Sequence, residues 1–272
     1  MSAPLTPMAM VRAPWRHRTL LFQLVRREIL GRYRGSFLGI AWAVLHPLVL
    51  LAVYTFIFRV VFQARWGAEH ATTEDFALML FAGLVVFQLF AECFQRAPHL
   101  VLQNPNYVTK VVFPLEILPW VSLASAVFQA AIGFGVLTAA TAILRPQALH
   151  WTALAVPVLL VPLCGVILGL SWFLAALGVY VRDLGPLVQL GTTVLMFLSP
   201  IFYPASALPE RFRGLLALNP LLPSIEMVRD ALLRGALPDP AVMLAWCAAG
   251  LLTAWAGFAW FQKTRTGFAD VL

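Results

Sequence analysis

The chain has 272 residues, of which 61% are hydrophobic and 11% are charged, and its mean hydropathy is +0.84. A soluble domain has about 25% charged residues, so this composition excludes a water-soluble surface and indicates a protein that lipid covers. In such a protein the net charge of +7 is interpreted from where the basic residues lie relative to membrane spans, and not as a nucleic-acid-binding surface.

The N-terminal region divides into two parts. Residues 1–14 have the appearance of a disordered segment. Residues 15–36 begin with WRHRTLLFQLVRREILG, in which apolar residues are interleaved with arginines. This pattern predicts a basic amphipathic helix on the membrane surface, ended by Gly31 and followed by a turn; a soluble helical cap is the alternative. No signal peptide is expected, because the next apolar stretch is too long for one.

The transmembrane domain is expected over residues 37–272, with an all-α fold. A helix needs roughly 20 apolar residues to cross about 30 Å of hydrocarbon. Residues 204–240 contain only short apolar pieces broken by Pro and Gly, which predicts outer re-entrant helices shielded by protein. Six transmembrane helices are predicted, at about residues 37–62, 76–97, 117–144, 151–181, 184–203 and 241–262.

The distribution of Lys and Arg predicts the orientation. With the N-terminus inside, twelve of the nineteen basic residues fall on the cytoplasmic side. Because cytoplasmic loops carry an excess of Lys and Arg, we expect both termini in the cytoplasm.

Motifs for chemistry are missing from the sequence. Its two lysines, Lys110 and Lys263, lie outside any G-x-x-x-x-G-K-[ST] loop, and no H-E-x-x-H or Cys/His cluster occurs. Cys93, Cys164 and Cys247 share no spacing that would suggest disulfides or metal binding. We therefore expect no catalytic residue, metal site or cofactor in this chain.

The charges within the spans disfavour ion-coupled transport. Such transporters bury acidic residues at mid-membrane depth, whereas the centres of the third to sixth spans carry no charge. Glu92 and Arg96, four residues apart on one helix face, are expected to pair locally. Energy should therefore come from a separate subunit.

Aromatic residues recur in the first, second and fifth spans. Their rings can face lipid as an interfacial belt, or they can stack on sugar faces in a channel. The candidate channel residues, chosen by position, are Trp42, Tyr54, Phe58, Phe62, Phe87, Phe90, Phe197, Phe202 and Tyr203.

Four segments in order resemble the membrane subunit of polysaccharide-exporting ABC transporters, the type-2 ABC permeases that export O-antigen or teichoic acid. They are residues 27–62, 104–119 (NPNYVTKVVFPLEILP), 178–204 (GVYVRDLGPLVQLGTTVLMFLSPIFYP) and 218–233 (LNPLLPSIEMVRDALL). The order of the four makes the resemblance specific, and it runs through nearly the whole chain from about residue 20.

The resemblance implies a homodimer in the bacterial inner membrane, paired with two copies of a separate ATPase that binds ATP and Mg²⁺. The exported substrate would be a lipid-linked glycan. The helix over 15–31 is similar to the family's interface helix, near the lipid-linked end of the substrate. The residues expected to guide a pyrophosphate head group, because Arg donates two hydrogen bonds to phosphate, are Arg27, Arg32, Tyr33, Arg34 and Ser36.

The resemblance also implies where the ATPase docks. Residues 104–115 are similar to the family's cytoplasmic coupling helix, and residues 182–183 to its second cytoplasmic contact. The residues expected to couple to the ATPase are Asn106, Tyr107, Lys110, Phe113, Pro114, Glu116, Arg182 and Asp183.

Three other functions stay open at this point. The same fold could export a capsule glycan or a teichoic acid, because the glycan cannot be read from the sequence. It could also export a drug or a small lipid, which would not need a continuous aromatic-lined channel. A membrane-embedded glycosyltransferase would need clustered acidic residues near one membrane face, and no D-x-D-like cluster occurs.

Overall fold

The computed structural model describes residues 6–57, 73–109, 113–204, 214 and 219–271. Within these ranges the chain is helical and contains no strand, as the all-α prediction required. Several of its helices can cross a membrane, which confirms a multi-pass protein. Five helical segments are long and apolar enough to do so: Gly39–Phe56, Phe76–His99, Leu115–Leu144, Trp151–Tyr180 and Pro240–Asp270.

The structure differs from the expectation at the N-terminus, where residues 7–14 were expected to be disordered. Helix α1 (Pro7–Arg16) begins at Thr6, whose side chain accepts a hydrogen bond from the backbone N–H of Ala9 at 3.4 Å. A capping Thr followed by Pro at the first helical position is a helix-start signal. Residues 1–5 lie outside the described part of the chain.

Helix α2 (Arg18–Tyr33) corresponds to the predicted interface helix and continues two residues past Gly31. One face of α2 packs on the protein. Its Leu24 is buried in a cluster with Ile117 and Val121, which lie just before and within the first turn of α6 (Leu118–Leu144). The opposite face is exposed.

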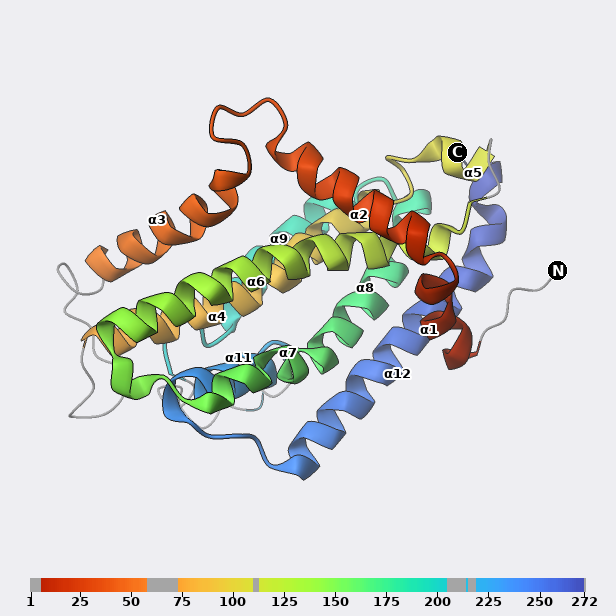
Figure 1. Ribbon diagram of the computed structural model, residues 1–272. Coiled ribbons are helices and arrows are strands. Elements are labelled where there is room, and N and C mark those ends of the chain that lie inside the picture. Colours follow the sequence, from red (N-terminus) through yellow and green to blue (C-terminus); the bar gives the residue numbers. More distant parts are fainter. Residues whose placement is uncertain (1–5, 58–72, 110–112, 205–213, 215–218, 272) are drawn as a thin grey trace.

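Helix α3 (Trp42–Phe56) follows a turn at Gly35 and Gly39, whose φ angles of 82° and 53° favour glycine. A short 3₁₀ turn, η1 (Gly39–Ala41), leads into it. Helix α3 contacts α4 and α6 but stands at the edge of the bundle (Figure 1). Only 17% of the segment Gly39–Phe56 is buried.

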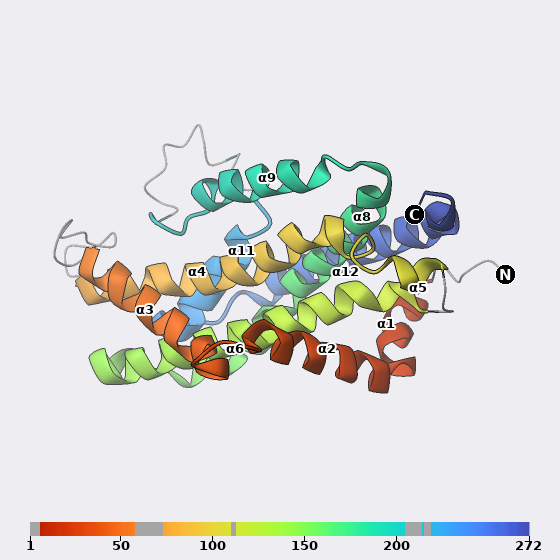
Figure 2. The same ribbon diagram turned by 90° about the horizontal axis from the view of Figure 1, so that it is seen from above.

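Helix α4 (Thr73–Arg96) forms the centre of the bundle. In its most apolar window 89% of the residues are buried, because five helices contact it. They are α3, α6 (Leu118–Leu144), α8 (Val161–Tyr180), α9 (Leu184–Leu198) and α11 (Leu222–Arg229). Figure 2 shows α4 between α9 on one side and α6 on the other. Any polar side chain on α4 therefore faces either the core or a cavity.

The fourth predicted span is broken into three helical pieces. They are the 3₁₀ turn η6 (Trp151–Ala155), α7 (Val156–Leu159) and α8 (Val161–Tyr180), which follows the break at Leu160. Another 3₁₀ turn, η5 (Pro146–Ala148), precedes the span.

Helix α8 packs along α12 (Pro240–Thr264) with very close backbones. A Cβ on Gly169 would lie 2.2 Å from the carbonyl oxygen of Thr253, and a Cβ on Gly257 would lie 2.0 Å from that of Gly169. Glycines permit this approach between membrane helices.

The fifth predicted span, 184–203, is shorter than expected. Helix α9 (Leu184–Leu198) has 15 residues, or about 22 Å at 1.5 Å per residue, against about 30 Å of hydrocarbon. In the region where re-entrant helices were predicted, α11 (Leu222–Arg229) continues into a π-helix, η8 (Asp230–Arg234), and stops at Gly235. Residues 205–213 and 215–218 of that region lie outside the described part.

The remaining short elements gather with α1 at one end of the bundle, as Figures 1 and 2 show. They are η3 (Ala97–His99), α5 (Pro105–Thr109), η4 (Leu115–Ile117) and η9 (Arg265–Asp270).

Candidate functional site

Polar residues on α4 mark the candidate site. From Phe76 to Ala91 every residue of α4 is buried except Gln88. One turn further on, Glu92 lies half-buried on the same face, because residues four apart in a helix share a face. Gln95 and Arg96 follow one turn later. A polar stripe on the most central helix indicates a hydrophilic surface inside the bundle.

The stripe borders a cavity of about 490 Å³ between α3, α4, α6 and the end of α2. Its walls combine hydrogen-bonding groups with aromatic rings, a mixture typical of ligand sites. The polar and aromatic lining residues are Arg32, Tyr33, Trp42, His46, Tyr54, Phe81, Gln88, Glu92 and Gln129.

A second cavity of about 560 Å³ lies on the other side of the stripe, between α4 and α9. Thr192, Thr193 and Gln95 add further hydrogen-bonding groups there. Arg32, Gln88 and Glu92 line both cavities. The two cavities therefore meet at these three side chains.

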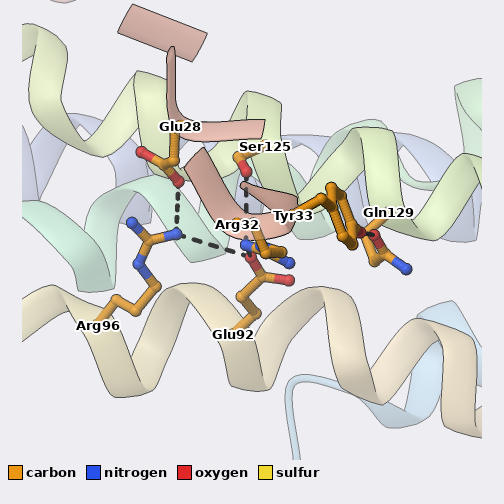
Figure 3. Close-up of polar contacts among 7 residues, drawn as sticks. All are labelled: Glu28, Arg32, Tyr33, Glu92, Arg96, Ser125 and Gln129. Carbon is orange, nitrogen blue, oxygen red and sulfur yellow. Dashed lines mark hydrogen bonds and ion pairs between the residues drawn. The ribbon is translucent and has the colours of Figure 1, made fainter. Parts of the chain in front are cut away.

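A chain of ion pairs joins α2 to α4 at this meeting point (Figure 3). Arg96 pairs with Glu28 and lies 3.7 Å from Glu92, and Glu92 pairs with Arg32. Arg32 Nη2 also lies 3.5 Å from the buried Ser125 Oγ. The four charged side chains are 18–35% exposed, so each ion pair contributes about 1 kcal/mol at most to the stability of the fold. Each side chain can therefore exchange its partner for another charged group at little cost.

The next residue of α2 makes a neutral link to α6. The Tyr33 hydroxyl donates a hydrogen bond to Gln129 Oε1 at 2.7 Å, and Gln129 Nε2 donates to the backbone oxygen of Ala43 at 3.2 Å. The hydrogen bond to Glu92 raises the pKa of Arg32, and partial burial raises the pKa of Tyr33. Both groups therefore keep their protons, and Arg32 keeps its charge.

The predicted coupling helix also contacts α2. Arg27 Nη2 donates a hydrogen bond to the hydroxyl of Tyr107 on α5 at 3.3 Å. The Tyr107 ring stacks on Phe113 with the ring centroids 4.2 Å apart. Phe113 packs against the buried cluster of Leu24, Ile117 and Val121, to which α2 contributes Leu24. The sequence assigned Arg27 to guidance of the lipid head group and Tyr107 to coupling with the ATPase, and the structure places the two side chains in contact.

Glu116 is held by α8 and by η9 near the C-terminus. Arg265 Nη1 donates to Glu116 Oε2 at 3.0 Å, and Trp172 Nε1 donates to the backbone oxygen of Glu116 at 3.0 Å. Glu116 thereby joins the start of α6 to η9 and α8.

The structure distributes the candidate channel residues over different environments. Trp42 and Tyr54 line the first cavity, and Phe87 lines the second. Phe90 is only 1% exposed and stacks on Phe94 at 4.9 Å. Phe90 is therefore a core residue, and we remove it from the channel set.

The aromatic residues near the end of α9 form a separate group. Phe197 is 62% exposed, and its ring lies 6.2 Å from that of Phe202. Tyr203 donates hydrogen bonds to the backbone oxygens of Phe197 and Leu198. Neither of the two cavities includes them. Phe58 and Phe62 lie outside the described residues.

The other predicted residues lie at the protein surface. Arg34, Asn106, Arg182 and Asp183 are exposed, and Pro114 is half-buried. The Ser36 hydroxyl donates to the backbone oxygen of Tyr33 at 3.1 Å, so its contact serves the turn after α2. Lys110 lies outside the described residues.

Sequence reasoning missed the buried Arg229. It donates hydrogen bonds to the backbone oxygens of Met79 (2.9 Å), Pro200 (2.6 Å) and Ile201 (3.1 Å), and pairs with Glu226 at 2.9 Å. Arg229 therefore ties α11 to α4 and to the end of α9. The spacing of Glu226 and Arg229, three residues apart between prolines, was the available signal.

Gln88, Gln95, Gln129, Thr192 and Thr193 were missed for another reason. They are uncharged and isolated along the sequence, and helix packing alone brings them to the two cavities.

Comparisons with known proteins agree with the four sequence motifs. The family model for the ABC-2 type transporter matches residues 19–233. An O-antigen export system permease protein RfbA from Myxococcus xanthus is 29% identical over 263 residues, which are 96% of this chain and 98% of the relative. Two proteins of the same name from Klebsiella pneumoniae are each 26% identical over 255 residues, 93% of this chain and 95% of each relative. The chain therefore belongs to the ABC-2 type transporter family, the type-2 ABC permeases.

Proposed function

We propose that the chain is the membrane-spanning subunit of an ABC transporter that exports a lipid-linked O-antigen polysaccharide across the bacterial inner membrane. The observation that carries this proposal is the similarity, over nearly the full length of each protein, to relatives named O-antigen export system permeases. The chain itself provides the path, and a separate ATPase binds ATP and Mg²⁺.

The polar stripe of α4 suits a glycan. Amide and hydroxyl groups such as those of Gln88, Gln129 and Thr193 can donate and accept hydrogen bonds with sugar hydroxyls. Trp42 and Tyr54 offer apolar ring faces. Because many weak contacts replace one tight site, successive sugars can bind and leave.

Two copies of the chain would enclose the channel. Helices α3 and α9 carry large exposed apolar side chains such as Val49, Val53, Leu187 and Leu190, and both border the cavities. In a homodimer these helices would meet the second copy and close the open sides of the cavities. The fifth predicted span, 184–203, which contains α9, would then complete six crossings, with α11 as an outer re-entrant helix.

Energy would enter at the end of the bundle that carries α5 and η9, which we place in the cytoplasm with both termini. An ATPase that moves α5 would pull on Tyr107, which is hydrogen-bonded to Arg27 of α2, and on Phe113, which packs against the cluster that contains Leu24 of α2. Movement of α2 would in turn shift Arg32 against Glu92, at the junction of the two cavities. A phosphate group could then replace Glu92 as the partner of Arg32.

The proposal is tested in cells that lack their own O-antigen exporter but make the lipid-linked glycan. The chain is expressed with its cognate ATPase, and surface O-antigen is measured by antibody labelling of intact cells. We expect surface labelling only when both proteins are present, and co-purification of the two in detergent.

The matched control is the same pair with an ATPase whose hydrolysis is blocked. Labelling that persists with this control, or a chain that binds no ATPase, would contradict the proposal. Export of a capsule glycan or teichoic acid instead of O-antigen would keep the transporter but change its substrate. Export only of small amphiphiles would favour the drug or small-lipid exporter.

A further inference from the structure

Helix α1 has two opposite faces, and only one of them has a partner in the chain. Met10 is 4% exposed and packs within the main core, where α1 contacts α12 and η4. Met8, Val11 and Trp15 are 59%, 57% and 74% exposed. At about 100° per residue these three fall within about 60° of one another and lie about 100–160° around the helix from Met10.

The exposed apolar face is bordered by positive charge. Arg12 and Arg16 are exposed on α1, and the guanidinium of Arg18 lies 5.9 Å from the centroid of the Trp15 ring. The first 27 residues contain five arginines and no Asp or Glu. An acidic protein surface and an anionic lipid surface would both complement this charge.

The same arrangement recurs on α2. Its Leu24 faces the protein, and Phe22 on the opposite face is 70% exposed. Helices α1 and α2 lie next to each other at the same end of the bundle (Figures 1 and 2). The exposed face of α1 therefore lies at the same end of the bundle as the helix that the sequence placed on the membrane surface.

We propose that α1 is a second interfacial helix, which lies in the head-group layer of an anionic bilayer with Met8, Val11 and Trp15 inserted and Arg12, Arg16 and Arg18 on lipid phosphates. A lipid surface fits better than a protein partner because a Trp-bearing apolar stripe next to arginines is typical of helices that lie in the interface. The proposal requires that the chain spans a membrane with this end at the cytoplasmic leaflet, and it is independent of the exported glycan.

The contact would fix the position of α2 as well as α1. Only His17 separates α1 from α2, so a lipid-anchored α1 limits how far the start of α2 can move. The far end of α2 carries Arg32, at the junction of the cavities. Anionic lipid would thereby favour one position of the α2–α4 contact.

The test uses the full-length chain in nanodiscs, with Cys93, Cys164 and Cys247 replaced by alanine and a spin label on Val11→Cys. Label accessibility is measured with lipid-soluble oxygen and with a water-soluble nickel chelate. A label on Asn106→Cys, an exposed site on α5, is the aqueous control in discs without the ATPase, because α5 is expected to contact the ATPase when it is present. Discs contain either zwitterionic lipid alone or a mixture with anionic phosphatidylglycerol, each with and without the ATPase.

In anionic discs we expect the accessibility of the Val11→Cys label to oxygen to be several times its accessibility to the nickel chelate. The Asn106→Cys label should show the reverse. Replacing Arg12, Arg16 and Arg18 with Gln should reduce the oxygen preference in anionic discs only. High salt should act in the same direction, because it screens exposed charges.

Two results would overturn the proposal. The first is a Val11→Cys label as accessible to the nickel chelate as the Asn106→Cys label in anionic discs, which would leave α1 in water. The second is a label shielded from both reagents only when the ATPase is bound, which would assign the face to that protein. Neither result depends on whether O-antigen is exported, so this inference can fail while the proposed function stands.

Discussion

The contact between α8 and α12 and the contact between α2 and α4 are built in opposite ways. In the first, glycines bring two backbones together with no space between them; a Cβ on Gly250 would lie 2.4 Å from the carbonyl oxygen of Pro162. In the second, four charged side chains join the helices beside two cavities. A close backbone contact has one arrangement, whereas partly exposed ion pairs can change partners. The comparison indicates a fixed part and a movable part within one chain.

The largest expected effect comes from filling the fixed contact. In Gly169→Leu the new side chain meets the backbone of Thr253, so we expect a loss of stability on the order of 3 kcal/mol. The measurement is the thermal midpoint of the monodisperse peak in detergent. Gly135→Leu is the matched control, because nothing lies within 4 Å of a Cβ there. Equal thermal midpoints for the two variants would show that the contact between α8 and α12 can relax around a larger side chain.

The second prediction concerns Arg229, which is fully buried between α11, α4 and the end of α9. Arg229→Met leaves three backbone oxygens without this donor and should cost about 2 kcal/mol. The neighbouring Arg234→Met should be nearly neutral, because the Arg234–Asp230 pair is exposed at the surface. The same thermal measurement checks both. A neutral Arg229→Met would mean that α11 is held by apolar packing alone.

The third prediction concerns the movable part. Arg32→Gln should lower stability by about 1 kcal/mol or less, while reducing surface O-antigen several-fold and leaving the ATPase bound. Arg26→Gln, on the exposed side of α2, should leave export unchanged. If Arg32→Gln exported normally, the junction between the cavities would not lie on the path.

The smallest expected effect lies at the coupling helix. Tyr107→Phe removes the hydrogen bond from Arg27 and keeps the ring on Phe113, so we expect a cost of about 0.5 kcal/mol and about a twofold lower ratio of glycan exported to ATP hydrolysed. Tyr107→Ala also removes the ring contact and should lower the ratio further. Equal ratios in all three proteins would exclude this contact from coupling.

The parts of the fold that depend on local sequence could be predicted. Long apolar runs identify spans because each run must cross the hydrocarbon by itself, and helices α4, α6, α8 and α12 lie where such runs were found. Helix α1 was missed because residues 1–14 were expected to be disordered, although Thr6 before Pro7 marks a helix start.

The parts of the site that depend on tertiary packing could not be predicted. Glu92 was expected to pair with Arg96 four residues away, which the structure places at 3.7 Å, but its shorter contact is with Arg32, 60 residues away. The crossing of α2 over α4 determines that contact, and no local pattern records it. Gln88 was overlooked for the same reason: one glutamine in an apolar helix has no sequence signal for what it faces.

The most direct test of the account asks whether glycan passes along the polar stripe of α4. A photoactivatable phenylalanine analogue at Gln88 is irradiated in cells that make the lipid-linked glycan, with the ATPase present. The account predicts a glycan adduct at Gln88 and none at Leu251, an exposed position on α12. Adducts at Leu251 but not at Gln88 would place the path elsewhere and contradict the central claim.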